Sequence, residues 1–199
     1  MMFLVYKCAT TGLPLFGEPD NDPGQPHIVR LAAILCDDDG DMVDELDKIV
    51  APDGWEIPEA TVPFHGITTD GALNTGEPEL AVIQRFVDLA DQAARRVAHN
   101  EPFDSRIIRY ALARYLPDQV EAWATKPEPY CTMKATKDLL AAEGPPPWMR
   151  GRGIKLQPIY EYLVGSDWEN EWAKDASVTA DCVRQIYVQL QRRGVPALV

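Results

Sequence analysis

The segment FLVYKCATTGLP, residues 3–14, is the first candidate for chemistry. A short apolar strand that runs into a Thr-Thr-Gly-Leu turn is a layout that normally brings two carboxylates up to a metal ion. In this chain Lys7 and Ala9 stand where those acids would be. An ammonium group only donates hydrogen bonds and cannot ligate a cation. The segment therefore indicates either a metal site that has lost its ligands or a site rebuilt around a lysine.

The run AHNEPFD, residues 98–104, is the second candidate and ends on Asp104. Its Asp closes a predicted strand-to-helix turn. Such an Asp can cap the helix that follows, and its carboxylate oxygens can also hold a divalent cation. We interpret His99 of this run, and His65 of the earlier segment HGIT, as structural rather than catalytic residues.

The N-terminal part of the chain, which carries the first of these segments, is predicted to consist of strands. Apolar, β-prone runs predict strands over residues 3–8, in HIVRLAAILCD from His27 and in DMVDELDKIVAP from Asp41. Asp39-Gly40 lies between the last two runs and is a strong hairpin signal. The first three strands are therefore expected to form an antiparallel meander.

Helices and further strands alternate in the rest of the chain. Helical spacing of apolar residues predicts helices over 77–94, 103–115, 133–142, 155–164 and about 174–193, with short strands at RRVAHN and PYCTM. Strands first and strand-helix alternation afterwards predict an α/β fold, a mixed β-sheet flanked by α-helices. No repeat or linker divides the sequence, so we expect one domain over residues 1–199.

Composition narrows the function classes. The 199 residues carry a formal net charge of -12, which disfavours a protein that grips nucleic acid through phosphate neutralisation alone. The four cysteines form no C-x-x-C pair, so neither a zinc site nor a disulfide framework is expected. No apolar run approaches 18 residues. We expect a cytoplasmic protein without a membrane partner.

Five motifs in a fixed order carry a family resemblance that covers nearly the whole chain. They are TTGL, HGIT, AHNEPFD, CTMKAT and KLQPIYEYLVG, of which AHNEPFD is the most specific. In order and spacing the chain resembles the DnaQ-like exonucleases of the RNase H-like superfamily. It is similar to the proofreading subunit of DNA polymerase III and to RNase T, members of the DEDDh branch of 3′-to-5′ exonucleases. The resemblance implies an RNase H-like sheet.

The resemblance also implies a metal-dependent site that this chain has largely lost. The family uses two Mg²⁺ or Mn²⁺ ions, held by carboxylates, and a histidine as general base. Its pattern is D-x-E on the first strand, an Asp after the A-H-N run, and H-x-x-x-x-D at the last helix. Carried onto this chain, D-x-E falls on Lys7 and Ala9, and Asp104 is the only retained acid.

The last motif has two registers, Lys174 with Thr179 or Ala176 with Asp181. The apolar stripe of the last helix, Val183, Ile186 and Leu190, extends backwards by four residues to Thr179. Asp181 falls about 200° around the helix from Val183. We therefore favour Lys174 and Thr179.

On that register four of five catalytic positions are changed, and no metal cofactor is expected. Lys7, Lys174 or both are expected to pair with Asp104. Alternatively, the two lysines contact a phosphate directly.

Nucleic-acid contacts are further expectations. By resemblance they fall on the turn and the segments near the substrate: Thr10, Thr11, Gly12, Leu13, His65, Asn100 and Phe103. A basic loop adds Trp148, Arg150 and Arg152, where the indole could stack on a base. The same loop is also explained as a solvated turn.

Three functions follow. The first is a catalytically inactive, exonuclease-like module that binds a single-stranded nucleic-acid end, a nucleotide or a protein partner. The second is an active 3′-to-5′ exonuclease on single-stranded DNA or RNA with an unusual site. The third is a structural or regulatory subunit with an unrelated ligand.

Overall fold

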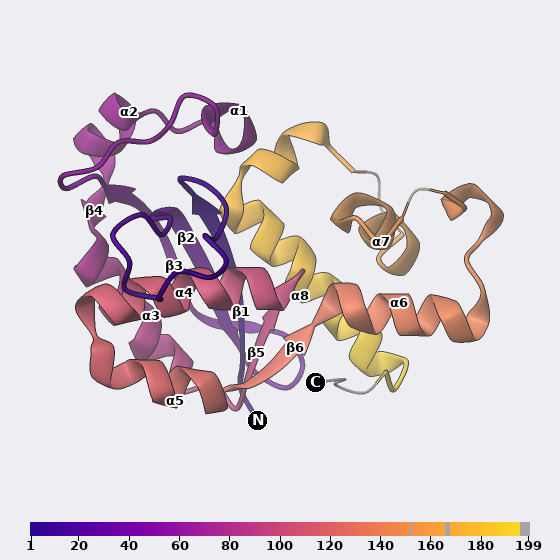
Figure 1. The fold of residues 1–199 in the computed structure, drawn as a ribbon. Coiled ribbons are helices and arrows are strands. Elements are labelled where there is room, and N and C mark those ends of the chain that lie inside the picture. The colour runs from indigo at the N-terminus through magenta and orange to yellow at the C-terminus, as the bar shows by residue number, and fades with distance from the viewer. Residues whose placement is uncertain (152, 166–167, 196–199) are drawn as a thin grey trace.

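The computed structural model describes residues 1–151, 153–165 and 168–195 and is built on one six-stranded mixed sheet (Figure 1). The strand order is β4-β3-β2-β1-β5-β6. β1, β2 and β3 pair antiparallel, while β5 and β6 continue the sheet in parallel from β1. Their bounds are β1 Phe3–Thr10, β2 Ile28–Cys36, β3 Met42–Ala51, β4 Glu77–Pro78, β5 Arg95–Ala98 and β6 Glu128–Cys131. This arrangement confirms the predicted α/β mixed sheet with its antiparallel meander.

Helices cover both faces of the sheet (Figure 1). Alternate residues of β1 point to opposite faces: Phe3 and Val5 pack with α6, α7 and α8, whereas Leu4 and Tyr6 pack with α3, α4 and α5. The helices are α1 Val62–His65, α2 Thr69–Thr75, α3 Glu79–Ala90, α4 Glu101–Tyr115, α5 Val120–Thr125, α6 Thr132–Glu143, α7 Leu156–Leu163 and α8 Ala176–Arg192. In the described ranges three 3₁₀ turns accompany them, Pro117–Gln119, Pro147–Met149 and Asn170–Lys174.

The hairpin between β2 and β3 has both a local and a tertiary reason. Gly40 adopts a φ of 90°, a left-handed conformation that favours glycine. A Cβ atom built at Gly40 would also lie 2.5 Å from Cγ2 of Val188 on α8. The Asp39-Gly40 signal is thus fixed by turn geometry and by helix packing together.

The last helix starts later than predicted. The apolar pattern suggested a start near Lys174, but α8 begins at Ala176 because Asp175 caps it. The Asp175 carboxylate accepts hydrogen bonds from the backbone N–H groups of Ser177 and Val178, at 2.9 and 3.2 Å. Lys174 therefore ends a separate 3₁₀ turn instead of lying in the helix.

The short helices α1, α2 and α5 were not predicted. α1 has four residues and contains Pro63, so it carries too little periodicity to be recognised. α1 lies close to the turn that follows β1, since residues of both line one cavity. No helix in the described ranges is long and apolar enough to cross a membrane.

Candidate functional site

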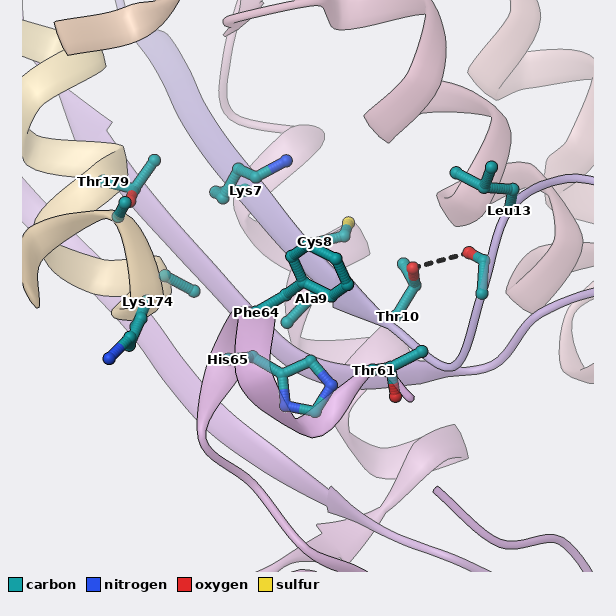
Figure 2. Close-up of a pocket in the computed structure, with 13 residues that line it drawn as sticks. Lys7, Cys8, Ala9, Thr10, Leu13, Thr61, Phe64, His65, Lys174 and Thr179 are labelled. Atoms are coloured by element: carbon teal, nitrogen blue, oxygen red, sulfur yellow. Dashed lines mark hydrogen bonds between the residues drawn. The ribbon is translucent and has the colours of Figure 1, made fainter. Parts of the chain in front are cut away.

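A cavity of about 450 Å³ lies where the C-terminal end of β1 meets α1 and the start of α8 (Figure 2). Three segments far apart in the sequence form its walls. They contribute Lys7, Cys8, Ala9, Thr10, Gly12 and Leu13 from β1 and the turn, Thr61, Phe64 and His65 from α1, and Ala173, Lys174, Ala176 and Thr179 from the α8 side. Most of this surface is apolar.

Lys7 and Asp104 form an ion pair at the inner end of the cavity. Lys7 Nζ lies 2.8 Å from Asp104 Oδ1, and the backbone N–H of Cys8 donates to the same oxygen at 2.9 Å. Asp104 is fully buried, while the Lys7 side chain is 27% exposed. The ring of Phe103 lies beside the ammonium, with its centroid 5.5 Å from Nζ. This geometry matches the expected pairing for Lys7.

Burial and charge act in opposite directions on this pair. Burial raises the pKa of Asp104, and the nearby Lys7 ammonium only partly opposes that rise. For Lys7, burial alone would lower the pKa, but the charge and hydrogen bond of Asp104 outweigh it and raise the pKa above its ordinary value. Lys7 is therefore protonated at neutral pH, and each group depends on the other for its charge.

The side chains at this site do not supply the oxygen ligands that two divalent cations, implied by the family resemblance, would need. Among the described residues no carboxylate lines the cavity. Asp104 lies behind the wall formed by β1, and its Oδ1 is already used by an ammonium and an N–H group. Its Oδ2 is buried and has no hydrogen-bond partner. In the part of the chain that is described, no grouping of three or more His, Cys, Asp or Glu side chains could hold a metal. A cation would also meet the charge of Lys7.

His65 presents one unused hydrogen-bond donor. Its Nδ1 accepts the N–H of Ile67 at 3.1 Å, so in the neutral ring the proton sits on Nε2. Burial lowers the pKa of His65, which keeps the ring neutral. The side chain is buried, and Nε2 has no hydrogen-bond partner. A ligand in this cavity that brings an acceptor would satisfy a group that is otherwise costly to bury.

Ala176, like Lys174, lines the cavity, but the acid positions of the two candidate registers, Thr179 and Asp181, fall on different sides of α8. Thr179 lines the cavity and donates its hydroxyl to the backbone oxygen of Trp172 at 3.0 Å. Asp181 lies on the other side, where it accepts hydrogen bonds from Arg184 and Gln185. Lys174 lines the cavity mouth but pairs with Glu171, and Figure 2 shows its ammonium turned away from Lys7. Pairing with Asp104 is therefore made by Lys7 alone.

The turn after β1 is held in place by hydrogen bonds to His27, the residue before β2, and by a bond within the turn. Thr11 exchanges two bonds with His27, from its own N–H to the His27 oxygen and from the His27 N–H to its hydroxyl. Thr10 donates its hydroxyl to the Gly12 oxygen at 2.7 Å (Figure 2). These bonds leave the Leu13 side chain 76% exposed at the cavity rim.

Phe64 completes the rim and was missed by sequence reasoning. Its side chain is 74% exposed beside His65. Position alone could have suggested it, because an aromatic residue directly precedes the HGIT motif. Leu13 and Phe64 together give the cavity an apolar entrance.

The remaining predicted contacts lie away from the cavity lining. Asn100 is exposed with a φ of 69° at the start of α4. Trp148 and Arg150 are exposed in the connection between α6 and α7 (Figure 1), and Arg152 lies outside the described residues. His99 bonds to Thr132 and to the Ile154 oxygen, and burial lowers its pKa to about 4. A neutral, doubly bonded His99 fits the structural interpretation.

Fold and site together define an exonuclease-type α/β domain in which Lys7 is paired with the buried Asp104. A family model described as exonuclease, the RNase T family, matches residues 10–149. This chain belongs to that family, a DnaQ-like branch of the RNase H-like superfamily.

Relatives agree with the family assignment. A DNA polymerase III subunit epsilon-like protein of Rhodobacter capsulatus is 33% identical over 111 residues, which are 55% of this chain and 14% of that protein. E. coli exonuclease I in complex with a dT13 oligonucleotide superposes with a TM-score of 0.73 at 21% identity, covering 96% of this chain and 41% of that one. An exonuclease I complex with SSB-Ct gives 0.67 at 21% identity over 96% and 42%. The chain thus spans well under half the length of these proteins.

Proposed function

We propose that this chain is a catalytically inactive, exonuclease-fold module whose cavity binds the end of a single-stranded nucleic acid, or a nucleotide, without a divalent metal. The observation that carries the proposal is the 2.8 Å pair between Lys7 and Asp104. The acid that would hold a cation is committed to an internal cation. Because an uncompensated buried charge is strongly unfavourable, the pair is not easily opened to admit a metal.

The cavity offers a ligand more apolar contact than charge. Leu13 and Phe64 present exposed side chains at the rim, and an aromatic side chain can stack on any base. Inside, His65 supplies an N–H donor without a partner, which would suit a carbonyl or ring nitrogen acceptor. Lys7 has donors beyond the one used by Asp104. Solved structures of exonuclease I in complex with single-stranded DNA support a nucleic-acid end as the ligand class.

Binding of a nucleic acid in the cavity should depend only weakly on salt concentration, because the lysines there are already paired. Both lysines at the cavity are paired with carboxylates, Lys7 with Asp104 and Lys174 with Glu171. Few phosphate charges would be neutralised on binding, so few counterions would be released. We expect modest affinity that changes little between low and physiological salt.

Binding is tested with a 5′-fluorescein-labelled dT8 oligonucleotide, measured by anisotropy in EDTA. We expect binding to persist without metal. Phe64→Ser and Leu13→Ser should each weaken it by about tenfold, the scale of a lost stacking or apolar contact. Leu73→Ser is the matched control, because Leu73 is 56% exposed on α2 and does not line the cavity. If all three variants bind alike, the cavity is not the binding site.

Activity is tested by incubating the same oligonucleotide with Mg²⁺ or Mn²⁺. We expect full-length oligonucleotide to remain. Shortening from the 3′ end that Asp104→Asn abolishes would show that the chain is an active exonuclease and would overturn the inactive assignment.

A further inference from the structure

A second groove, of about 430 Å³, runs between β3 and α8 along the edge of the sheet face. Strand register builds its floor and one wall: Ala32 of β2 pairs with Asp47 of β3, and Ile34 pairs with Glu45. The small and apolar side chains of β2 form the floor, and the acids of β3 stand at the edge. The opposite wall is one stripe of α8, Ser177, Val178, Asp181 and Arg184.

Negative charge dominates the lining of this groove. Its acids are Asp41, Glu45, Asp47 and Asp181, and Arg184 is the one basic residue that lines it. Asp181 is paired with Arg184, and Asp47 is paired with Arg30.

Two of these acids have no protein partner within the described ranges. The carboxylates of Asp41 and Glu45 make no hydrogen bond or ion pair there, and both residues are exposed. Asp41 ends the Asp37–Asp41 hairpin, and Glu45 follows on β3. This surface therefore favours a cationic occupant over a nucleic acid.

An exposed apolar side chain lies beside the acids. Met42 lines the groove and is 58% exposed. A simple solvated acidic surface does not need this side chain. An apolar floor with an acidic edge is complementary to a segment that carries both basic and apolar residues.

We infer that this groove docks a basic segment of a protein partner, with an apolar side chain seated against Met42 and Ile34 and a Lys or Arg placed between Asp41 and Glu45. The site is separate from the cavity, because the two lie on different sides of α8. The inference does not depend on what the cavity binds. Attraction between exposed charges gives this interaction a clear salt dependence.

Three synthetic heptapeptides test the groove, with alternating Lys and Leu, Glu and Leu, or Lys and Ser. Binding to the ¹⁵N-labelled full chain is followed by NMR at low and physiological salt. We expect the Lys-Leu peptide to bind at least tenfold more tightly than either of the others, with shifts of amides in residues 41–47 and 177–184. Shifts confined to other regions, or equal binding of the Lys-Ser peptide, would overturn the proposal.

Charge-matched variants separate a local site from general attraction to an acidic protein. Glu45→Lys should weaken the Lys-Leu peptide by about tenfold. Asp88→Lys makes the same change in net charge at an exposed position of α3, on the other side of the sheet, and should change the affinity by less than twofold. Equal losses in both variants would overturn the proposal. So would a change in oligomeric state caused by Glu45→Lys, since the groove would then be an interface between copies of this chain.

Discussion

Thr179 and Asp181 are two residues apart on α8, yet they face different surfaces of the molecule. On the Thr179 side lies a mostly apolar cavity in which Lys7 and Asp104 neutralise each other. On the Asp181 side lies an open groove in which exposed acids remain without partners in the described structure. Because successive helical residues turn by about 100°, a shift of two positions moves a side chain to the opposite side of the helix. The chemistry of each side of α8 therefore depends on whether its acidic side chains are paired or exposed, and not on the net charge of the chain.

Of the changes near the cavity, removal of the Lys7 ammonium should lower the stability of the protein most. Lys7→Met leaves the Asp104 carboxylate fully buried without a cation, and we expect a loss of about 3 kcal/mol in the free energy of unfolding at pH 7. Urea denaturation measures it. The burial that already raises the pKa of Asp104 is then unopposed by Lys7. Stability of the variant should therefore recover as the pH falls through that raised pKa, since the folded state takes up the proton first.

The double variant Lys7→Met/Asp104→Asn is the control for that experiment. The amide that replaces the carboxylate is uncharged, and its oxygen can still accept the N–H of Cys8, so at least half of the lost stability should return. If the double variant is as unstable as Lys7→Met at pH 7, the loss comes from packing of the lysine stem and not from the buried charge.

Restoring acids should convert the cavity side into a metal site. The triple variant Lys7→Asp/Ala9→Glu/Thr179→Asp places three new carboxylates with Asp104. We expect Mn²⁺ to bind at least a hundredfold more tightly than to the wild type, about 3 kcal/mol, by titration calorimetry. The double variant Lys7→Asp/Ala9→Glu is the control: it keeps Thr179, so Asp181 is the only acidic residue of α8. If it binds Mn²⁺ as tightly as the triple variant, Asp181 reaches the cavity and the contrast between the two sides fails.

The smallest effects compare Thr179 and Asp181 directly. Thr179→Val removes the hydroxyl that donates to the Trp172 oxygen and should cost about 1 kcal/mol. Asp181→Asn weakens bonds to Arg184 and Gln185 near the surface and should stay within about 0.5 kcal/mol. Both are measured by urea denaturation at pH 7. A larger loss for Asp181→Asn would mean that the groove side of α8 carries more of the fold than its exposure implies.

Much of the fold was predictable because its long elements carry strong local patterns. The apolar runs of β1 to β3, the Asp39-Gly40 turn and the stripe Val183, Ile186 and Leu190 of α8 were recognised, and the structure buries that stripe. α1 and α2 were not predicted, because four to seven residues carry too few turns for a helical period. The late start of α8 depends on a cap at Asp175, which the apolar pattern alone overlooked.

Residues of the candidate site could be predicted only where a sequence motif or a helical period identifies their positions. The order of the motifs led to Lys7 and Asp104, and the helical period led to Thr179. The partner of Lys174 was not predictable, since a 3₁₀ turn brings Glu171 to it. The groove also escaped sequence reasoning, because it exists only through the register of β2 against β3 and the placement of α8 over them.

The short β4 has a consequence for how this protein meets copies of itself. β4 pairs with β3 only at Val50 and Ala51, so the rest of that edge of β3 has no strand partner in the described structure. An open edge is a template on which another sheet can add strands. Here the stretch reads Asp44, Glu45, Leu46, Asp47 and Lys48, in which Leu46 is buried, Asp44 is half-buried and the other three are exposed. The carboxylates of a second edge brought alongside would repel these, so the charges of β3 protect the protein against edge-to-edge aggregation.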